Sequence, residues 1–128
     1  MKDFSLLILR IVFGGLMLFN HALPKFDKLS NTPIKFPDPL GVGSDISLYL
    51  VLFSEGLCSI LLVLGLFTRF ASLPLVFTMS VAAFYIHLDD SLDGKEASLL
   101  YLAAYIILLA FGAGKFSLDK LIRPRAKF

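Results

Sequence analysis

Apolar residues run along this chain in four long blocks that polar residues separate. The blocks cover roughly residues 4–23, 47–67, 70–88 and 95–112. Each block, at 1.5 Å of rise per helical residue, is long enough to cross a bilayer core of about 30 Å. Pro24 predicts that the first helix ends after Leu23, because proline lacks an amide donor and disfavours a helical residue before it. The pattern therefore predicts an all-α membrane protein, an antiparallel bundle of four transmembrane helices, with residues 1–128 forming a single domain.

Composition supports the membrane assignment. Hydrophobic residues make up 57% of the chain and charged residues only 17%, whereas about a quarter of the residues in a soluble domain are charged. Polar side chains in a soluble chain of this length could not cover so large an apolar core. A cleaved signal peptide is not expected, since Arg10 interrupts the first block and no cleavage pattern precedes Pro24.

Basic residues are distributed unequally between the two ends of the predicted bundle. Seven fall on the side of the termini: Lys2, Arg69, Lys115, Lys120, Arg123, Arg125 and Lys127. Four fall on the opposite side: Lys25, Lys28, Lys35 and Lys95. The positive-inside rule then places both termini in the cytoplasm and the protein in the cytoplasmic (inner) membrane.

The strongly polar residues of the first helix, except Asn20, share one face. Arg10, Gly14, Met17, His21 and Lys25 follow one another at intervals of three or four residues, the spacing of one helical face. This face is expected to line the interior of the bundle.

Glu55 lies inside the second apolar block, where a charge costs about 2.5–3.5 kcal/mol on insertion scales. It is therefore expected to face the bundle interior and to pair with Arg10. Such a pair can belong to a functional site or can serve only to fix helix register.

Further ionisable residues occur at the helix ends. His21, His87 and Glu96 fall on the side opposite the termini and are predicted to converge on one cavity, and Lys25, Lys28 and the loop 30–45 are expected to cover the same end. Alternatively, the two histidines are interfacial residues in contact with water. Haem ligation by the histidines is disfavoured, because both lie near the surface and the chain has no haem-attachment cysteine pair.

Two of the charged residues at the end that carries the termini have opposite charge and are expected to meet. Arg69 lies between the second and third helices, and Asp119 lies in a short helix "LDKLI" expected at the membrane surface. An Arg69–Asp119 ion pair is predicted to close this end of the bundle.

The lone cysteine limits the chemistry of the chain. Cys58 cannot form an intrachain disulfide or a Cys-x-x-Cys pair, and it is expected to serve in packing. Nothing resembles a nucleotide-binding loop, a metal triad or a nucleic-acid surface. A redox-active centre would therefore lie on a partner protein or on a bound quinone.

Two long segments carry a family resemblance. "RIVFGGLMLFNHALPKF" (10–26) and "EGLCSILLVLGLFTR" (55–69), followed by "GAGKFSLD" (112–119), resemble the DoxX family in order and spacing. The resemblance implies a four-helix membrane protein whose relatives include the small membrane subunit of thiosulfate:quinone oxidoreductase. It also implies which positions matter: Arg10, His21, Lys25, Glu55, Arg69, His87, Glu96 and Asp119.

The side chains suggest a site for a lipophilic electron carrier. A quinone headgroup has two carbonyl acceptors and takes up protons on reduction, so its site needs a donor and a carboxylate. His21, Lys25, Glu55, His87 and Glu96 supply these groups, and no metal is predicted. The expected function is that of a small membrane subunit of a redox system that binds a quinone or another lipophilic substrate.

Two other functions stay open: a non-catalytic anchor or assembly subunit of a larger complex, and a small carrier. The expected partners are membrane lipids and other protein subunits, and no nucleic acid.

Overall fold

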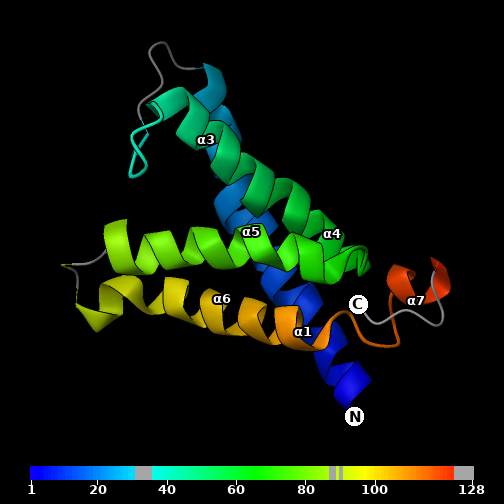
Figure 1. Cartoon of the computed structure of the whole chain (residues 1–128). Helices are drawn as coiled ribbons and strands as arrows, with labels where there is room; N and C mark the ends of the chain where they lie inside the picture. The colour runs from blue at the N-terminus through cyan, green and yellow to red at the C-terminus, as the bar shows by residue number, and fades with distance from the viewer. Residues whose placement is uncertain (31–35, 87–88, 90, 123–128) are drawn as a thin grey trace.

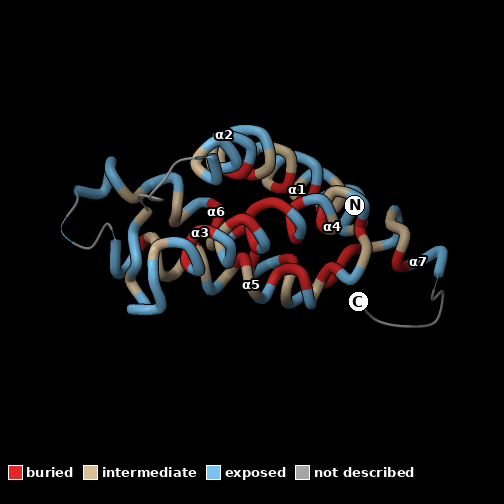
Figure 2. The backbone as a smooth tube through the Cα atoms, turned by 90° about the horizontal axis from the view of Figure 1, so that it is seen from above, coloured by how far each residue is buried: buried red, intermediate tan, exposed pale blue. Residues whose placement is uncertain are grey.

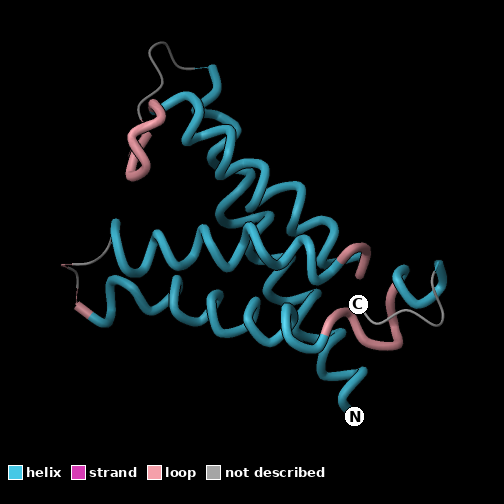
Figure 3. Tube along the Cα trace, in the orientation of Figure 1, coloured by secondary structure: helices cyan, strands magenta, loops and turns pink. Residues whose placement is uncertain are grey.

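The computed structural model describes residues 1–30, 36–86, 89 and 91–122. Every regular element in this part of the chain is helical, as Figure 3 shows. Four continuous stretches are long and apolar enough to cross a membrane: Lys2–Ser30, Ser44–Leu64, Thr68–Ile86 and Leu92–Phe111. The predicted all-α fold with four membrane-spanning helices is confirmed.

Three of the four stretches contain a π-helical segment. The first stretch consists of α1 (Lys2–Leu16), the π-segment η1 (Met17–Ala22), α2 (Leu23–Phe26) and the 3-10 turn η2 (Asp27–Ser30). The second consists of α3 (Ser44–Leu52), η3 (Phe53–Leu57) and α4 (Cys58–Leu64). The third consists of α5 (Thr68–Val81) and η4 (Ala82–Ile86), the fourth is α6 (Leu92–Phe111), and the short helix α7 (Leu118–Ile122) follows. Because π-helical turns are rare and frequently occur at functional sites, these segments draw attention to their side chains.

Pro24 does not end the first helix, and the predicted boundary at Leu23 is wrong. The amide of Leu23 donates to the carbonyl of Leu18, five residues back, as in a π-helix. This widened turn comes directly before Pro24 and rearranges the backbone hydrogen bonds where a proline ring would clash with a regular α-helix. The helical stretch therefore continues and carries Lys25 with it.

The long helices form two pairs that cross at an angle (Figure 1). One pair consists of the first stretch and α3–α4, and the other consists of α5 and α6. The pairs contact each other where α4 packs on α5 and α1 packs on α6, whereas the main contacts of α3 are with η3 and α2. We call the end with the N-terminus, the α4–α5 turn and α7 the terminal end, and the opposite end the loop end. The two pairs converge at the terminal end and separate toward the loop end.

The buried residues follow the interior of this arrangement (Figure 2). Many large apolar residues are exposed, among them Phe70, Phe77 and Phe84. The buried core includes Leu6, Met17, Leu62, Leu75 and Leu108. Gly14 lets α1 approach α4 closely, since a Cβ atom there would lie 3.2 Å from the Ser59 carbonyl oxygen. The exposed apolar surface is the one expected to contact lipid.

Candidate functional site

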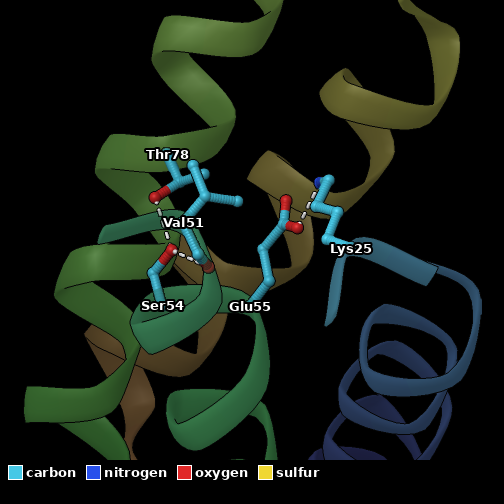
Figure 4. Close-up of polar contacts among 5 residues, drawn as sticks. All are labelled: Lys25, Val51, Ser54, Glu55 and Thr78. Atoms are coloured by element: carbon cyan, nitrogen blue, oxygen red, sulfur yellow. Dashed lines mark hydrogen bonds and ion pairs between the residues drawn. The ribbon is translucent and has the colours of Figure 1, made fainter. Parts of the chain in front are cut away.

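An ion pair between a buried glutamate and a partly buried lysine joins the first and second membrane-spanning stretches (Figure 4). The ammonium of Lys25 contacts Oε1 of Glu55. Glu55 lies in η3 and only 3% of its surface is exposed. By helical rise it lies about 16 Å from Ser44 and about 14 Å from Leu64, the ends of its stretch, so its carboxylate belongs near the middle of the apolar layer. A charge at this depth needs a partner, and Lys25 supplies it.

The predicted Arg10–Glu55 pair is wrong. Arg10 lies 15 residues before Lys25, or about 22 Å nearer the terminal end along the helix, and hydrogen-bonds to backbone carbonyls there. The prediction failed because ending the first helix at Leu23 moved Lys25 into a loop. With the helix continuing through Pro24, Lys25 is the basic residue that reaches Glu55.

Aromatic rings surround the site on the side of α6. The His21 ring, in η1, meets the Tyr101 ring edge-on at a centroid distance of 5.3 Å. Tyr101 also contacts Phe13 edge-on at 5.6 Å and stacks on Tyr105 at 5.9 Å. The hydroxyl of Tyr105 donates to the carbonyl of Phe13, 3.1 Å away. These contacts fix the rings across the interface between the two helix pairs.

A pair of hydroxyl groups joins η3 to α5 next to Glu55. Ser54 Oγ and Thr78 Oγ1 lie 2.8 Å apart and share a hydrogen bond, and Ser54 also donates to the Val51 carbonyl at 3.2 Å. Figure 4 shows this pair on one side of Glu55 and Lys25 on the other. Glu55 is therefore held between the two helix pairs.

Several polar atoms of this site have no partner in the described part of the chain. The Oε2 atom of Glu55, the ring nitrogens of His21 and the hydroxyl of Tyr101 make no hydrogen bond there. None of these atoms is among the fully buried unpartnered ones of the described residues, which are Arg10 Nε, Ser59 Oγ, Thr68 Oγ1 and Arg69 Nε, so each is accessible to water or a ligand. The arrangement offers two donors, an acceptor and an aromatic wall to a polar headgroup.

The remaining predicted site residues differ in their placement. Glu96 is exposed at the start of α6 and makes no hydrogen bond or ion pair within the described residues. His87 lies outside the described residues. The structure thus brings Lys25 and Glu55 together beside His21, and within the described residues Glu96 makes no hydrogen bond or ion pair with them.

Tyr101 and Tyr105 are site residues that the sequence analysis missed. They are four residues apart, which places both on one face of α6. This spacing is visible in the sequence, but only charged residues and histidines were considered as site residues. Cys58 is buried in the core, as the packing role requires. The described residues contain no group of three or more His, Cys, Asp or Glu side chains able to hold a metal ion.

At the terminal end, Arg10 binds the last carbonyls of α4. Its Nη1 atom donates to the carbonyls of Leu62 at 3.3 Å and Val63 at 3.4 Å, and Nη2 donates to that of Phe116. Arg10 is only 1% exposed. The last four carbonyls of a helix have no partner within it and carry its negative dipole end, so a guanidinium is favourable at this position.

Asp119 connects α7 to the α4–α5 turn, but it does not pair with Arg69 as predicted. Its carboxylate accepts hydrogen bonds from the amides of Phe67 at 2.7 Å and Thr68 at 3.2 Å, and its own amide donates to the Gly65 carbonyl at 2.9 Å. These amides begin α5, where N–H groups are free and the helix dipole favours an anion. The sequence predicted that Asp119 closes this end by binding Arg69. Asp119 does close it, but its partners are the backbone amides of Phe67 and Thr68.

The variant Asp119→Asn is expected to loosen α7 without preventing membrane insertion. The amide side chain keeps one acceptor oxygen but loses the charge and one of the two hydrogen bonds, each of which contributes about 1.5–3 kcal/mol when a charged group takes part. Faster proteolysis after Lys115 or Lys120 in membranes would measure the effect. Asp45→Asn, at an exposed aspartate, is the control and should leave the cleavage rate unchanged. If Asp119→Asn also leaves the rate unchanged, Asp119 does not hold α7 to the α4–α5 turn.

Asp38 organises the described part of the loop before α3. It accepts hydrogen bonds from the amides of Val42 at 3.0 Å and Gly43 at 2.8 Å and from the Ser47 hydroxyl at 2.9 Å. These donors, the Gly43 amide foremost, hold the pKa of Asp38 below its usual value. This role of Asp38 was not predicted, although an aspartate before a glycine-rich turn is typical of such capping.

The fold and the buried pair define a small four-helix integral membrane protein. The model of the DoxX family matches residues 5–88, and the chain belongs to this family. It is 35% identical over 127 residues to an uncharacterized protein of Haemophilus influenzae, covering 93% of this chain and 83% of that protein. A second uncharacterized protein of this organism is 32% identical over 125 residues, covering 92% and 90%. No solved structure matches.

Proposed function

We propose that the protein binds a quinone, or a lipophilic molecule with a similar neutral headgroup, beside the Lys25–Glu55 pair, as the membrane subunit of a redox system. The supporting observation is the Lys25–Glu55 ion pair, in which Glu55 is buried. The rings of His21 and Tyr101 lie next to it, and their polar atoms make no hydrogen bond in the described part of the chain. Intramembrane ionisable residues are by default functional candidates.

The charge balance of the site favours a neutral ligand. Lys25 and Glu55 offset each other, and among the described residues in contact at the site His21 is the further side chain that can carry a positive charge. An anion here would lose its hydration and would also compete with Glu55 for Lys25. A neutral ring with carbonyl oxygens avoids both costs.

The chain's own groups suit the two needs of such a ligand. Lys25, His21 and Tyr101 can donate hydrogen bonds to carbonyl oxygens, and the free oxygen of Glu55 can accept or release a proton. When bound, a quinone would supply the two-electron chemistry that the side chains of this chain lack. The tyrosine and phenylalanine rings provide a flat apolar wall.

The orientation proposed from the basic residues places the loop end outside the cytoplasm. The Lys25–Glu55 site would then exchange protons through the loop end, because Arg10 and Asp119 close the terminal end. A redox partner would dock from the membrane or from the extracytoplasmic side.

Quinone retention tests the proposal. Protein purified in mild detergent is extracted with organic solvent and its quinone content measured, alongside Glu55→Gln and Lys25→Gln. Quinone should accompany the parent protein and fall about tenfold in both variants, as expected for the loss of a hydrogen bond to a charged group.

Glu96→Gln is the matched control, because it makes the same chemical change at an exposed glutamate of α6. It should retain the parent quinone content. No quinone in any preparation, with the fold intact, would contradict the proposal and favour a non-catalytic assembly subunit. An equal loss of quinone in Glu96→Gln would indicate that the quinone binds at the loop end instead.

A further inference from the structure

A second candidate site lies at the terminal end, far from the Lys25–Glu55 pair. A hollow of about 460 Å³ opens there between the end of α4 and the segment that follows α6. Its lining is mostly apolar: Val63, Leu64, Phe116, Leu118 and Leu121, with Lys115 and Ser117. Since α4 ends at Leu64 and α6 at Phe111, the hollow lies where the apolar spans meet the membrane surface.

The walls of the hollow are held by buried polar contacts. Arg10 binds carbonyls on both sides of it, those of Leu62 and Phe116. Asp119 fastens α7 to the α4–α5 turn. The amide of Lys115 donates to Asp3 at 3.0 Å, which fixes the chain on the side of α1. These contacts hold α7 against the bundle, so the hollow is part of the folded structure.

Charge around the hollow is mainly basic. Lys115 is exposed at its lining, and Lys120 follows on α7. Of the nearest carboxylates, Asp119 is only 4% exposed and accepts amides of the α4–α5 turn. Asp3 lies beside the hollow, because its carboxylate accepts the Lys115 amide, and the two exposed lysines Lys115 and Lys120 outnumber it. Leu121, 77% exposed, and Ile122, 62% exposed, extend the apolar surface beside the basic groups.

We infer that this hollow binds an anionic phospholipid, with an acyl chain against Leu64, Phe116 and Leu121 and the headgroup phosphate beside Lys115. Basic pockets at the membrane surface attract anionic headgroups, and an apolar wall beside them suits an acyl chain. With the termini in the cytoplasm, the lipid would belong to the cytoplasmic leaflet. The inference does not depend on the proposed quinone site.

Lipid retention in detergent tests this inference. The full-length protein is equilibrated with micelles that contain equal amounts of phosphatidylglycerol and phosphatidylcholine, separated from free micelles, and its bound lipid is quantified. The parent protein should retain phosphatidylglycerol in preference, and Lys115→Gln should lower this preference about fivefold, the loss expected for one lysine beside anionic headgroups. Leu121→Ser should lower total retention.

Lys28→Gln, at the loop end, is the control and should retain the parent preference. Each variant must keep the parent elution volume and thermal midpoint. Equal preference in the parent and Lys115→Gln, or an equal loss in Lys28→Gln, would overturn the inference. Higher lipid retention in a chain that ends at Ile122 would also overturn it, since residues 123–128 would then be the occupant.

Discussion

Lys25→Met is expected to lower the free energy of unfolding by about 3–5 kcal/mol, the usual cost of removing one partner of a buried ion pair. The cost is large because Glu55 is 3% exposed and Lys25 is its ion-pair partner in the described part of the chain. Methionine keeps most of the apolar length of lysine, so lost packing contributes little. Unfolding in mixed micelles of increasing denaturing detergent would measure the difference.

The double variant Lys25→Met/Glu55→Leu provides the decisive comparison. It removes both charges, so it should recover most of the stability that Lys25→Met loses, because apolar replacement of a buried ion pair is often neutral. Lys28→Met, one turn further along the first stretch, controls for the loss of a lysine. Additive losses in the double variant would show that Lys25 and Glu55 are not coupled.

The separate role of the pair in binding is visible in the same variants. If the charges serve only stability, the double variant should fold and still retain quinone. If they form the binding site, the double variant should fold without quinone. The proposed function requires the second result.

The fold was predictable from the sequence because hydrocarbon permits few solutions. Four apolar blocks of sufficient length must become helices, since an unpaired backbone amide is costly in lipid. The helical face of Arg10, His21 and Lys25 was also correctly placed inside, because burial of a charge leaves no other choice.

The partners of the charged residues were not predictable to the same degree. Each error came from one local feature that sequence rules do not capture. The π-segment η1 carries the first helix through Pro24 and brings Lys25, rather than Arg10, to Glu55. The end of α4 offered carbonyls to Arg10, and the start of α5 offered amides to Asp119. Such backbone groups compete well with side-chain partners.

Arg10→Leu is expected to destabilise the terminal end by about 3 kcal/mol or more. Arg10 donates to three backbone carbonyls, and a hydrogen bond to a charged group contributes about 1.5–3 kcal/mol. Leucine would leave the Val63 and Phe116 carbonyls without this donor in an apolar setting, whereas the Leu62 carbonyl still accepts the Gly65 amide at 3.1 Å. Arg10→Lys should fall between the parent and Arg10→Leu, because an ammonium keeps the charge but lacks the planar fork. Unfolding in mixed micelles would give this order.

Gly65→Ala tests the same contact from the other side without changing a charge. Gly65 has φ +71°, and a Cβ atom there would overlap Arg10 Nη1 and lie 2.5 Å from Ser117 Cβ. Gly41 has φ +72° but open space around it, so Gly41→Ala measures the backbone cost alone, about 1 kcal/mol. Gly65→Ala should cost about 1–3 kcal/mol more than Gly41→Ala, the range for overpacking. In an Arg10→Leu background this excess should shrink; an excess that stays the same would mean that the guanidinium does not occupy the space beside Gly65.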